Sequence, residues 1–242
     1  MRIGFFGDSF TAGAEAGADL NAPYGTATGL SADRPEFAFP SYFDNSINLG
    51  TSGGSNDFFV DQLVANLTNI DVAVFCLTDA NRRLYYDQDL CLNGMRVNEK
   101  QFGDNGGIGD MLSEEISRLS NDTFDDYQCS RICALLYLLC IANNIKPYFV
   151  NVFCSQLGKS QLWNIIPEDC WIIPKNQCIL NYCCNDTNSF VENPSHFPFS
   201  FRDWLDSNNE DVKKYIRPCD YHFNKSGHKV VADFLKKRID LK

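Results

Sequence analysis

Residues 2–13 read RIGFFGDSFTAG, and this stretch decides the fold. The apolar run Arg2–Phe6 ends at Gly7 and predicts a strand. Asp8 and Ser9 follow directly, at the carboxyl end of that strand, which is where open α/β sheets bind their ligands. The glycines before and after Ser9 allow a sharp turn and a close approach of the backbone to a ligand. The alternative is that Asp8 or Ser9 only caps the following helix.

Further apolar runs extend the pattern. Residues 71–77 read DVAVFCL without interruption, which is typical of a strand buried on both faces of a parallel sheet. Further strands are expected at Ser46–Leu49, Pro147–Phe153 and Asp169–Ile173, and helices at Ser55–Leu67, Asp125–Asn144, Arg202–Ile216 and Ser226–Ile239, with Ser55 and Ser226 as N-caps. This alternation predicts an α/β fold, a three-layer α/β/α sandwich around a parallel sheet.

The chain is expected to form one domain over residues 1–242. Three segments do not follow the alternating pattern. They are a long loop at 12–40, an insertion or lid around 83–109 and an irregular, Cys-rich segment around 156–198.

Composition excludes several classes of protein. The net charge is -10, and Lys and Arg form no long cluster, so nucleic acid is not an expected partner. No apolar stretch is long enough to predict a membrane span. The 11 cysteines include several inside apolar runs, and the N-terminus lacks a secretory pattern. Reduced thiols in the cytoplasm are therefore expected. Cys178, Cys183 and Cys184 offer a less favoured alternative, a metal-ligand cluster, and no metal is predicted.

A second chemical segment lies near the C-terminus, where residues 220–228 read DYHFNKSGH. A nucleophilic serine needs a base within hydrogen-bond reach and a carboxylate that orients the base. His222 follows Asp220 by two residues and precedes a predicted helix, which makes this pair the candidate base and orienting acid. His196 and His228 are interpreted as structural. The alternative for His222 is an ordinary surface or core histidine.

Together these segments resemble the SGNH/GDSL hydrolases. Residues 7–13 are similar to the first block of that family, and residues 220–228 to its last block. The resemblance implies a flavodoxin-like parallel sheet and cleavage of esters, thioesters or O-acetyl groups. It also implies that Ser9 is the nucleophile, His222 the base and Asp220 its partner. Many members place the aspartate three residues before the histidine.

The family also has oxyanion-binding blocks, and here the resemblance is uneven. Residues 48–54 read NLGTSGG and are similar to the glycine block, which implies that the Gly53 N–H donates to the oxyanion. The next block does not match, because a gap-free alignment places Thr78 and Ala80 on the usual glycine and asparagine. Asn81, after a one-residue slip, is the first candidate for the missing donor, followed by Thr78 and Arg82. The alternatives are a plain turn at Gly53 and surface ion pairs for the arginine.

The expected function is hydrolysis of an acyl ester through an acyl-enzyme, without metal or organic cofactor. The substrate would be a small-molecule, carbohydrate or lipid ester, such as an O-acetyl group on a sugar. Two alternatives stay open: a sugar O-acyltransferase with the same triad, and an inactive binding or structural protein, which the mismatched block at residues 77–83 favours. The divergent blocks also raise the hypothesis of a phage or viral origin.

Overall fold

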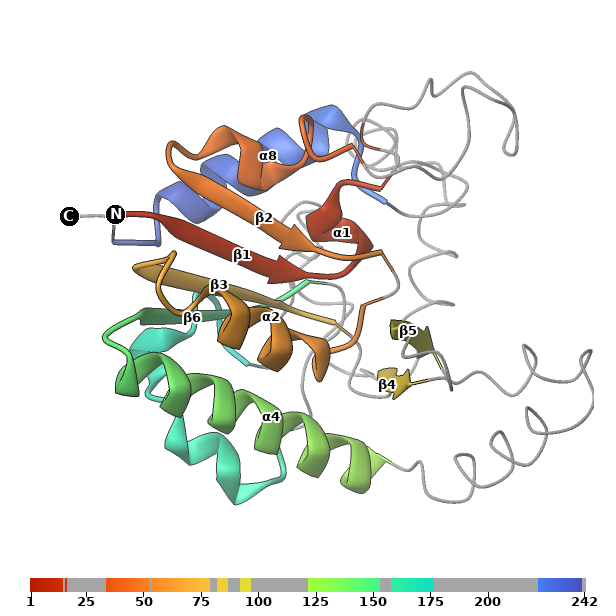
Figure 1. The fold of residues 1–242 in the computed structure, drawn as a ribbon, viewed down its shortest axis with the longest axis vertical. Coiled ribbons are helices and arrows are strands. Elements are labelled where there is room, and N and C mark those ends of the chain that lie inside the picture. Colours follow the sequence, from red (N-terminus) through yellow and green to blue (C-terminus); the bar gives the residue numbers. More distant parts are fainter. Residues whose placement is uncertain are drawn as a thin grey trace, which may run out of the picture.

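The computed structural model describes residues 1–14, 16, 34–52, 54–78, 82–86, 92–96, 122–152, 158–175 and 222–240. The central sheet has four strands, which Figure 1 shows side by side with helices on both faces. The parallel sheet has the order β2-β1-β3-β6 and comprises β1 (Ile3–Gly7), β2 (Ser46–Gly50), β3 (Val72–Leu77) and β6 (Lys146–Asn151). The fold is therefore the predicted α/β class.

Each face of the sheet carries its own core. On one face, α8 (Lys225–Lys236) and the 3-10 helix η1 (Phe39–Tyr42) cover alternate residues of β1, β3 and β6. On the other face, α2 (Phe58–Asn66) and α4 (Asp122–Ala142) cover the intervening residues. All six residues of β3 are buried. Burial on both faces explains why this strand is an unbroken apolar run.

Short elements complete the described structure. The helix α1 (Ser9–Ala12) follows β1, and two more 3-10 helices, η2 (Gln161–Ile165) and η3 (Glu168–Cys170), follow β6. The strands β4 (Arg82–Tyr86) and β5 (Leu92–Arg96) form an antiparallel pair inside the segment predicted as an insertion. The predicted helix at 202–216 and most of the segments 12–40, 83–109 and 156–198 lie outside the described residues.

Three local predictions were wrong. The strand expected at Asp169–Ile173 is reduced to a single bridge between Phe149 and Trp171, because η3 takes up its first residues. The N-cap position of α2 is Asp57 instead of Ser55, without a side-chain capping hydrogen bond, and α8 is capped by Asn224 instead of Ser226. The Asn224 side chain accepts a hydrogen bond from the Gly227 N–H, which places the cap two residues earlier than expected.

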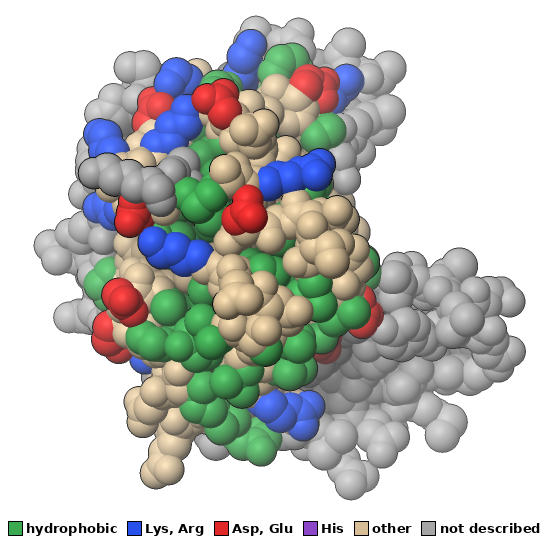
Figure 2. All heavy atoms as spheres, turned by 60° about the vertical axis from the view of Figure 1, so that its left-hand side comes forward, with side chains coloured by type: hydrophobic (Ala, Val, Ile, Leu, Met, Phe, Trp, Pro, Cys, Tyr) green, Lys and Arg blue, Asp and Glu red, His purple; other side chains and the backbone are tan. Residues whose placement is uncertain are grey.

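Helix α4 contacts the core on one side and carries apolar side chains on the other. Hydrophobic side chains gather over the lower part of the face in Figure 2, and Leu135, Leu138 and Ile141 of α4 are each about half exposed. Even so, no helix among the described residues is long and apolar enough to cross a membrane.

Candidate active site

Ser9 is positioned by the turn that joins β1 to α1. Asp8 is the N-cap of α1, and its Oδ1 accepts a hydrogen bond from the Phe10 N–H at 3.1 Å. Gly13 ends the helix after four residues with φ of 83°, in the left-handed region that favours glycine. Ser9 is therefore the first helical residue after the central strand, and its side chain is only partly buried.

Gly7 is required immediately before this turn. A Cβ at Gly7 would lie 1.9 Å from the Thr11 hydroxyl oxygen and 2.6 Å from Thr11 Cβ. Any larger residue would therefore push the first turn of α1 away from the strand. This close contact with Thr11 explains why the motif has a glycine at position 7.

His222 reaches the same place from the far end of the chain. It lies two residues before the cap of α8, and its neighbour Phe223 is fully buried. Val231 and Leu235 fix α8 against the sheet with exposed fractions of 1% and 0%. Because the helix is anchored over its length, the residue just before it has a defined position above the carboxyl ends of the strands.

The two candidate catalytic side chains meet. His222 Nε2 lies 2.8 Å from Ser9 Oγ, although 213 residues separate them in sequence. This is hydrogen-bond distance for a hydroxyl that donates to a neutral imidazole nitrogen. In that arrangement Nε2 is the acceptor and Nδ1 carries the ring proton. A serine beside a base is the pairing required for nucleophilic catalysis.

The Phe10 ring, near the N-terminus, packs against aromatic rings from the C-terminal part of the chain. The His222 ring lies over it at a centroid distance of 4.8 Å and an angle of 31°. Phe223 meets the same ring edge-on, at 5.2 Å and 79°. Phe10 thus contacts both His222 and Phe223. These contacts restrict the rotation of the His222 imidazole.

The other predicted site residues differ in what the structure describes. Asp220, Gly53 and Asn81 lie outside the described residues. Arg82 begins β4, and its side chain is likewise not described. Thr78 is fully buried just after β3, and its hydroxyl donates to Asp8 Oδ2 at 2.8 Å.

Sequence reasoning missed two residues that surround the site. Asn56 is 2% exposed. Its side-chain amide donates a hydrogen bond to the Thr78 carbonyl and accepts one from the Thr78 N–H. The sequence pattern includes Phe10 in a motif but indicates no role of its own for this residue. The aromatic residue beside each catalytic candidate, Phe10 and Phe223, was the available signal, but it did not show that the two rings meet.

His228 lies one helical turn into α8 and is fully buried. Burial lowers the pKa of His228 to about 3, with a smaller effect from the nearby His222. The Nδ1 atom of this neutral ring accepts a hydrogen bond from the Phe39 N–H at 3.2 Å. His228 therefore joins α8 to η1, in the structural role expected for it.

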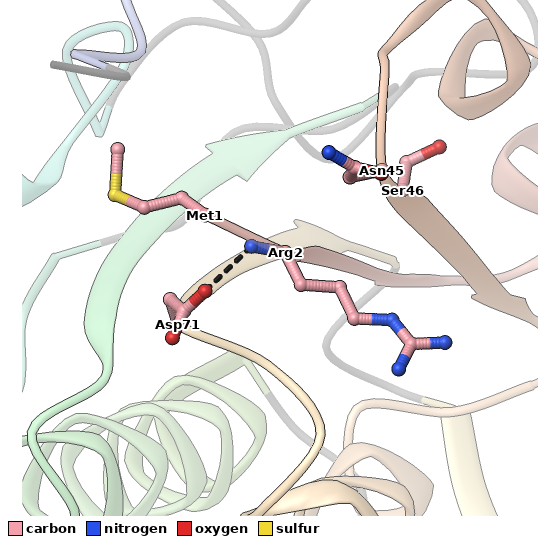
Figure 3. Close-up of a pocket in the computed structure, with 5 residues that line it drawn as sticks. All are labelled: Met1, Arg2, Asn45, Ser46 and Asp71. Atoms are coloured by element: carbon pink, nitrogen blue, oxygen red, sulfur yellow. Dashed lines mark hydrogen bonds between the residues drawn. The ribbon is translucent and has the colours of Figure 1, made fainter.

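A surface depression of about 560 Å³ lies elsewhere, at the amino ends of β1 and β2. Figure 3 shows its lining residues, with the Arg2 N–H donating to Asp71 Oδ2 at 2.6 Å. Ser9 and His222 lie at the opposite, carboxyl edge of the sheet. The depression therefore does not belong to the candidate site.

Among the residues described, no cluster of three His, Cys, Asp or Glu side chains suited to a metal ion is found.

Together these features define an α/β protein with a serine–histidine pair at the carboxyl edge of its parallel sheet. No family model and no curated protein matches the chain. Three solved structures that resemble it are esterases. The acetyl xylan esterase AlAXEase is 13% identical over 99% of this chain and 100% of its own, with a TM-score of 0.42.

The other two resemblances are similarly distant. A carbohydrate esterase is 14% identical over 100% of this chain and 68% of its own, with a TM-score of 0.45. Axe2, an acetylxylan esterase from Geobacillus stearothermophilus, is 12% identical over 100% and 94%, with a TM-score of 0.37. Resemblance at this level assigns no activity, which has to be argued from the chain's own residues.

Proposed function

We propose that the protein is a serine hydrolase that cleaves acyl esters through an acyl-enzyme on Ser9. One observation carries this proposal: the 2.8 Å contact between Ser9 Oγ and His222 Nε2 at the carboxyl edge of the sheet. An imidazole at that distance can remove the hydroxyl proton as the oxygen attacks a carbonyl carbon. Asp220 is the proposed partner of the opposite ring nitrogen, as the motif implies.

The proposed reaction has two steps, acylation of Ser9 and hydrolysis of the acyl-enzyme. In the first, Ser9 Oγ bonds to the acyl carbon and His222 takes the hydroxyl proton. The tetrahedral intermediate collapses, and the leaving alcohol departs with that proton. In the second, water gives a proton to His222 and its oxygen attacks the acyl carbon. The new tetrahedral intermediate collapses, His222 returns the proton to Ser9 Oγ, and the carboxylic acid departs.

The intermediate carries a negative oxygen that needs donors. As the first residue of α1, Ser9 has an N–H without an acceptor inside its own helix. No hydrogen bond from this N–H to another described residue is seen. The neighbouring Phe10 N–H, by contrast, is held by Asp8. The Ser9 N–H is the first proposed oxyanion donor, and the N–H of Gly53, which follows β2 in the sequence, is the second.

The test uses p-nitrophenyl acetate and acetylated saccharides as substrates. Ser9→Ala and His222→Asn should each lower turnover by about 10⁴-fold or more, because either change removes the attacking pair. Ser41→Ala is the matched control, since Ser41 is exposed in η1 and its hydroxyl donates only to the backbone carbonyls of Glu36 and Ala38. This control should keep full turnover.

A fluorophosphonate probe gives an independent reading, because it phosphonylates an activated serine without depending on the substrate. The wild-type protein should be labelled at Ser9, as located by peptide mass spectrometry, and Ser9→Ala should not. A wild-type protein that neither reacts with the probe nor turns over esters would contradict the proposal and favour a binding protein.

A further inference from the structure

Three buried polar side chains join the ends of two strands close to the candidate nucleophile. Asp8 follows β1, Thr78 follows β3, and Asn56 lies just before α2. Their exposed fractions are 0%, 0% and 2%. Burying a polar group costs free energy unless the group is hydrogen-bonded. Three such side chains at one place are therefore expected to have hydrogen-bond partners.

Asp8 and Thr78 are joined directly. The Thr78 hydroxyl donates to Asp8 Oδ2 at 2.8 Å, while Oδ1 accepts from the Phe10 N–H at 3.1 Å. Both oxygens of the buried carboxylate therefore receive a donor, one from its own turn and one from the neighbouring strand. Without the hydroxyl, one carboxylate oxygen would lose a bond in a place that water does not reach.

Asn56 fixes the backbone at Thr78. The Thr78 N–H donates to Asn56 Oδ1 at 3.0 Å, and Asn56 Nδ2 donates to the Thr78 carbonyl at 3.2 Å. This two-bond contact holds Thr78 just beyond Leu77, the last residue of β3 that pairs with β6. The Thr78 hydroxyl is therefore presented to Asp8 from a fixed position.

The network acts on the turn that carries Ser9. Asp8 and Ser9 share a peptide bond, and the Asp8 carbonyl accepts from the N–H groups of Thr11 and Ala12, both at 2.9 Å. A change in how the Asp8 carboxylate is held would tilt α1 and move Ser9 Oγ relative to His222. Misplacement of a reacting group by 1 Å can cost about 10²-fold in rate.

We infer that Thr78 is a positioning residue for Ser9, acting through the Asp8 carboxylate. The inference rests on the proposed function, because it assigns Thr78 a part in the same reaction. It replaces the direct oxyanion role expected from the sequence: the hydroxyl proton is given to Asp8, and the side chain is fully buried.

The experiment compares Thr78→Val, which keeps the shape and removes the hydroxyl, with Thr78→Ser, which keeps the hydroxyl. Turnover is expressed per Ser9 titrated with the fluorophosphonate, so misfolded molecules do not count. Thr78→Val should lower kcat by about 10- to 100-fold with KM changed less than about 3-fold, and Thr78→Ser should restore kcat to within about 3-fold. A merely structural role would reduce the titratable fraction and leave kcat per site unchanged.

A double-mutant cycle separates positioning from direct oxyanion binding. Asp8→Ser keeps a capping oxygen for the Phe10 N–H and is too short to reach Thr78. If Thr78 acts through Asp8, adding Thr78→Val to Asp8→Ser should cost less than about 2-fold in kcat. A repeat of the full loss in that background would overturn the inference and return Thr78 to the oxyanion.

The remaining outcomes are also decisive. Wild-type protein that is labelled, together with a Thr78→Val variant of equal kcat per site, overturns the inference and leaves the proposed function standing. Wild-type protein that is not labelled defeats the proposed function itself. If Thr78→Val does not fold, Thr78→Cys keeps the size with a weaker donor. Equal kcat per site in the cysteine and serine variants would then overturn the inference.

Discussion

At the scale of single residues, burial separates two potential nucleophiles, Ser9 just after β1 and Cys76 near the end of the neighbouring strand β3. Ser9 is partly exposed at the end of β1, beside an imidazole. Cys76 lies in β3, and its Cβ would be 3.1 Å from a Cβ at Gly7. Burial raises the pKa of Cys76 to about 12, so the thiol stays protonated and unreactive. Of these two groups, only the Ser9 hydroxyl is therefore accessible as a nucleophile.

This difference predicts the order in which thiols react. In native protein at pH 8, iodoacetamide should modify Cys170 before Cys76, because Cys170 is partly exposed and its pKa is raised only to about 11. Peptide mass spectrometry over a time course measures both sites in one sample, and urea-unfolded protein supplies the control in which they react alike. Modification of Cys76 as fast as Cys170 in the native state would contradict the assigned burial.

The sequence identified the catalytic candidates better than it identified their surroundings. Ser9 and His222 stand in short local motifs, so residue type and spacing were enough to select them. The bond between Asp8 and Thr78 joins residues 70 positions apart, and its formation depends on how two loops pack. No local pattern encodes such a contact, so the sequence alone does not predict that the Thr78 hydroxyl binds Asp8.

At the scale of elements, the contact between β2 and α1 leaves no room for a side chain. A Cβ at Gly50 would lie 2.4 Å from the Ala12 nitrogen and 2.7 Å from the Thr11 carbonyl carbon. Both are backbone atoms, which cannot rotate away. The last residue of β2 therefore sets how closely the helix that carries Ser9 can approach the sheet.

Gly50→Ala should consequently lower both stability and turnover. We expect a loss of about 1–3 kcal/mol in the free energy of unfolding, typical of overpacking, together with reduced kcat per titrated Ser9. Urea unfolding and ester hydrolysis measure the two effects. Gly158→Ala is the control: its φ of 69° imposes backbone strain, but no atom of the described residues lies within 4 Å of the added Cβ, so kcat should not change. Equal kcat in both variants would count against the close contact.

The sequence predicted strands correctly where both faces of the strand are buried. The strands β1 and β3 are apolar throughout, and β6 is apolar from Pro147 to Val150, because both faces of the sheet are covered. The run after residue 169 is also apolar, yet Pro167 precedes it and η3 occupies its start. Its apolar residues pack beside β6 without forming a ladder. Hydrophobicity alone reports burial, and it does not decide between a strand and an irregular edge segment.

At the scale of the whole molecule, the site exists only when both ends of the chain are folded onto the same sheet. Ser9 belongs to the first strand–turn–helix unit, and His222 is held by the last helix, α8. His228 helps to fix that helix, since its ring stacks on Phe39 at 5.9 Å and accepts the Phe39 N–H. A buried imidazole that supports this closure makes the folding equilibrium sensitive to pH.

The sign of that sensitivity follows from the lowered pKa. His228 titrates near 6.5 when unfolded and at about 3 when folded, so between these values the unfolded state binds more protons. Stability should therefore rise with pH from about 3 to 6.5 and level off above, with a slope of up to about 1.4 kcal/mol per pH unit from this residue. The loss at pH 5 relative to pH 8 should be about 2 kcal/mol.

His228→Gln tests this directly, because the amide oxygen of glutamine can accept the Phe39 N–H without taking up a proton. Urea unfolding between pH 5 and 8 should give a shallower pH dependence for the variant than for the wild type, whatever the offset at pH 8. The wild-type background of other titrating groups is shared by both proteins and cancels in the comparison. Parallel curves would mean that His228 has the same pKa in the folded and unfolded states, and that α8 is not sealed against the sheet as described.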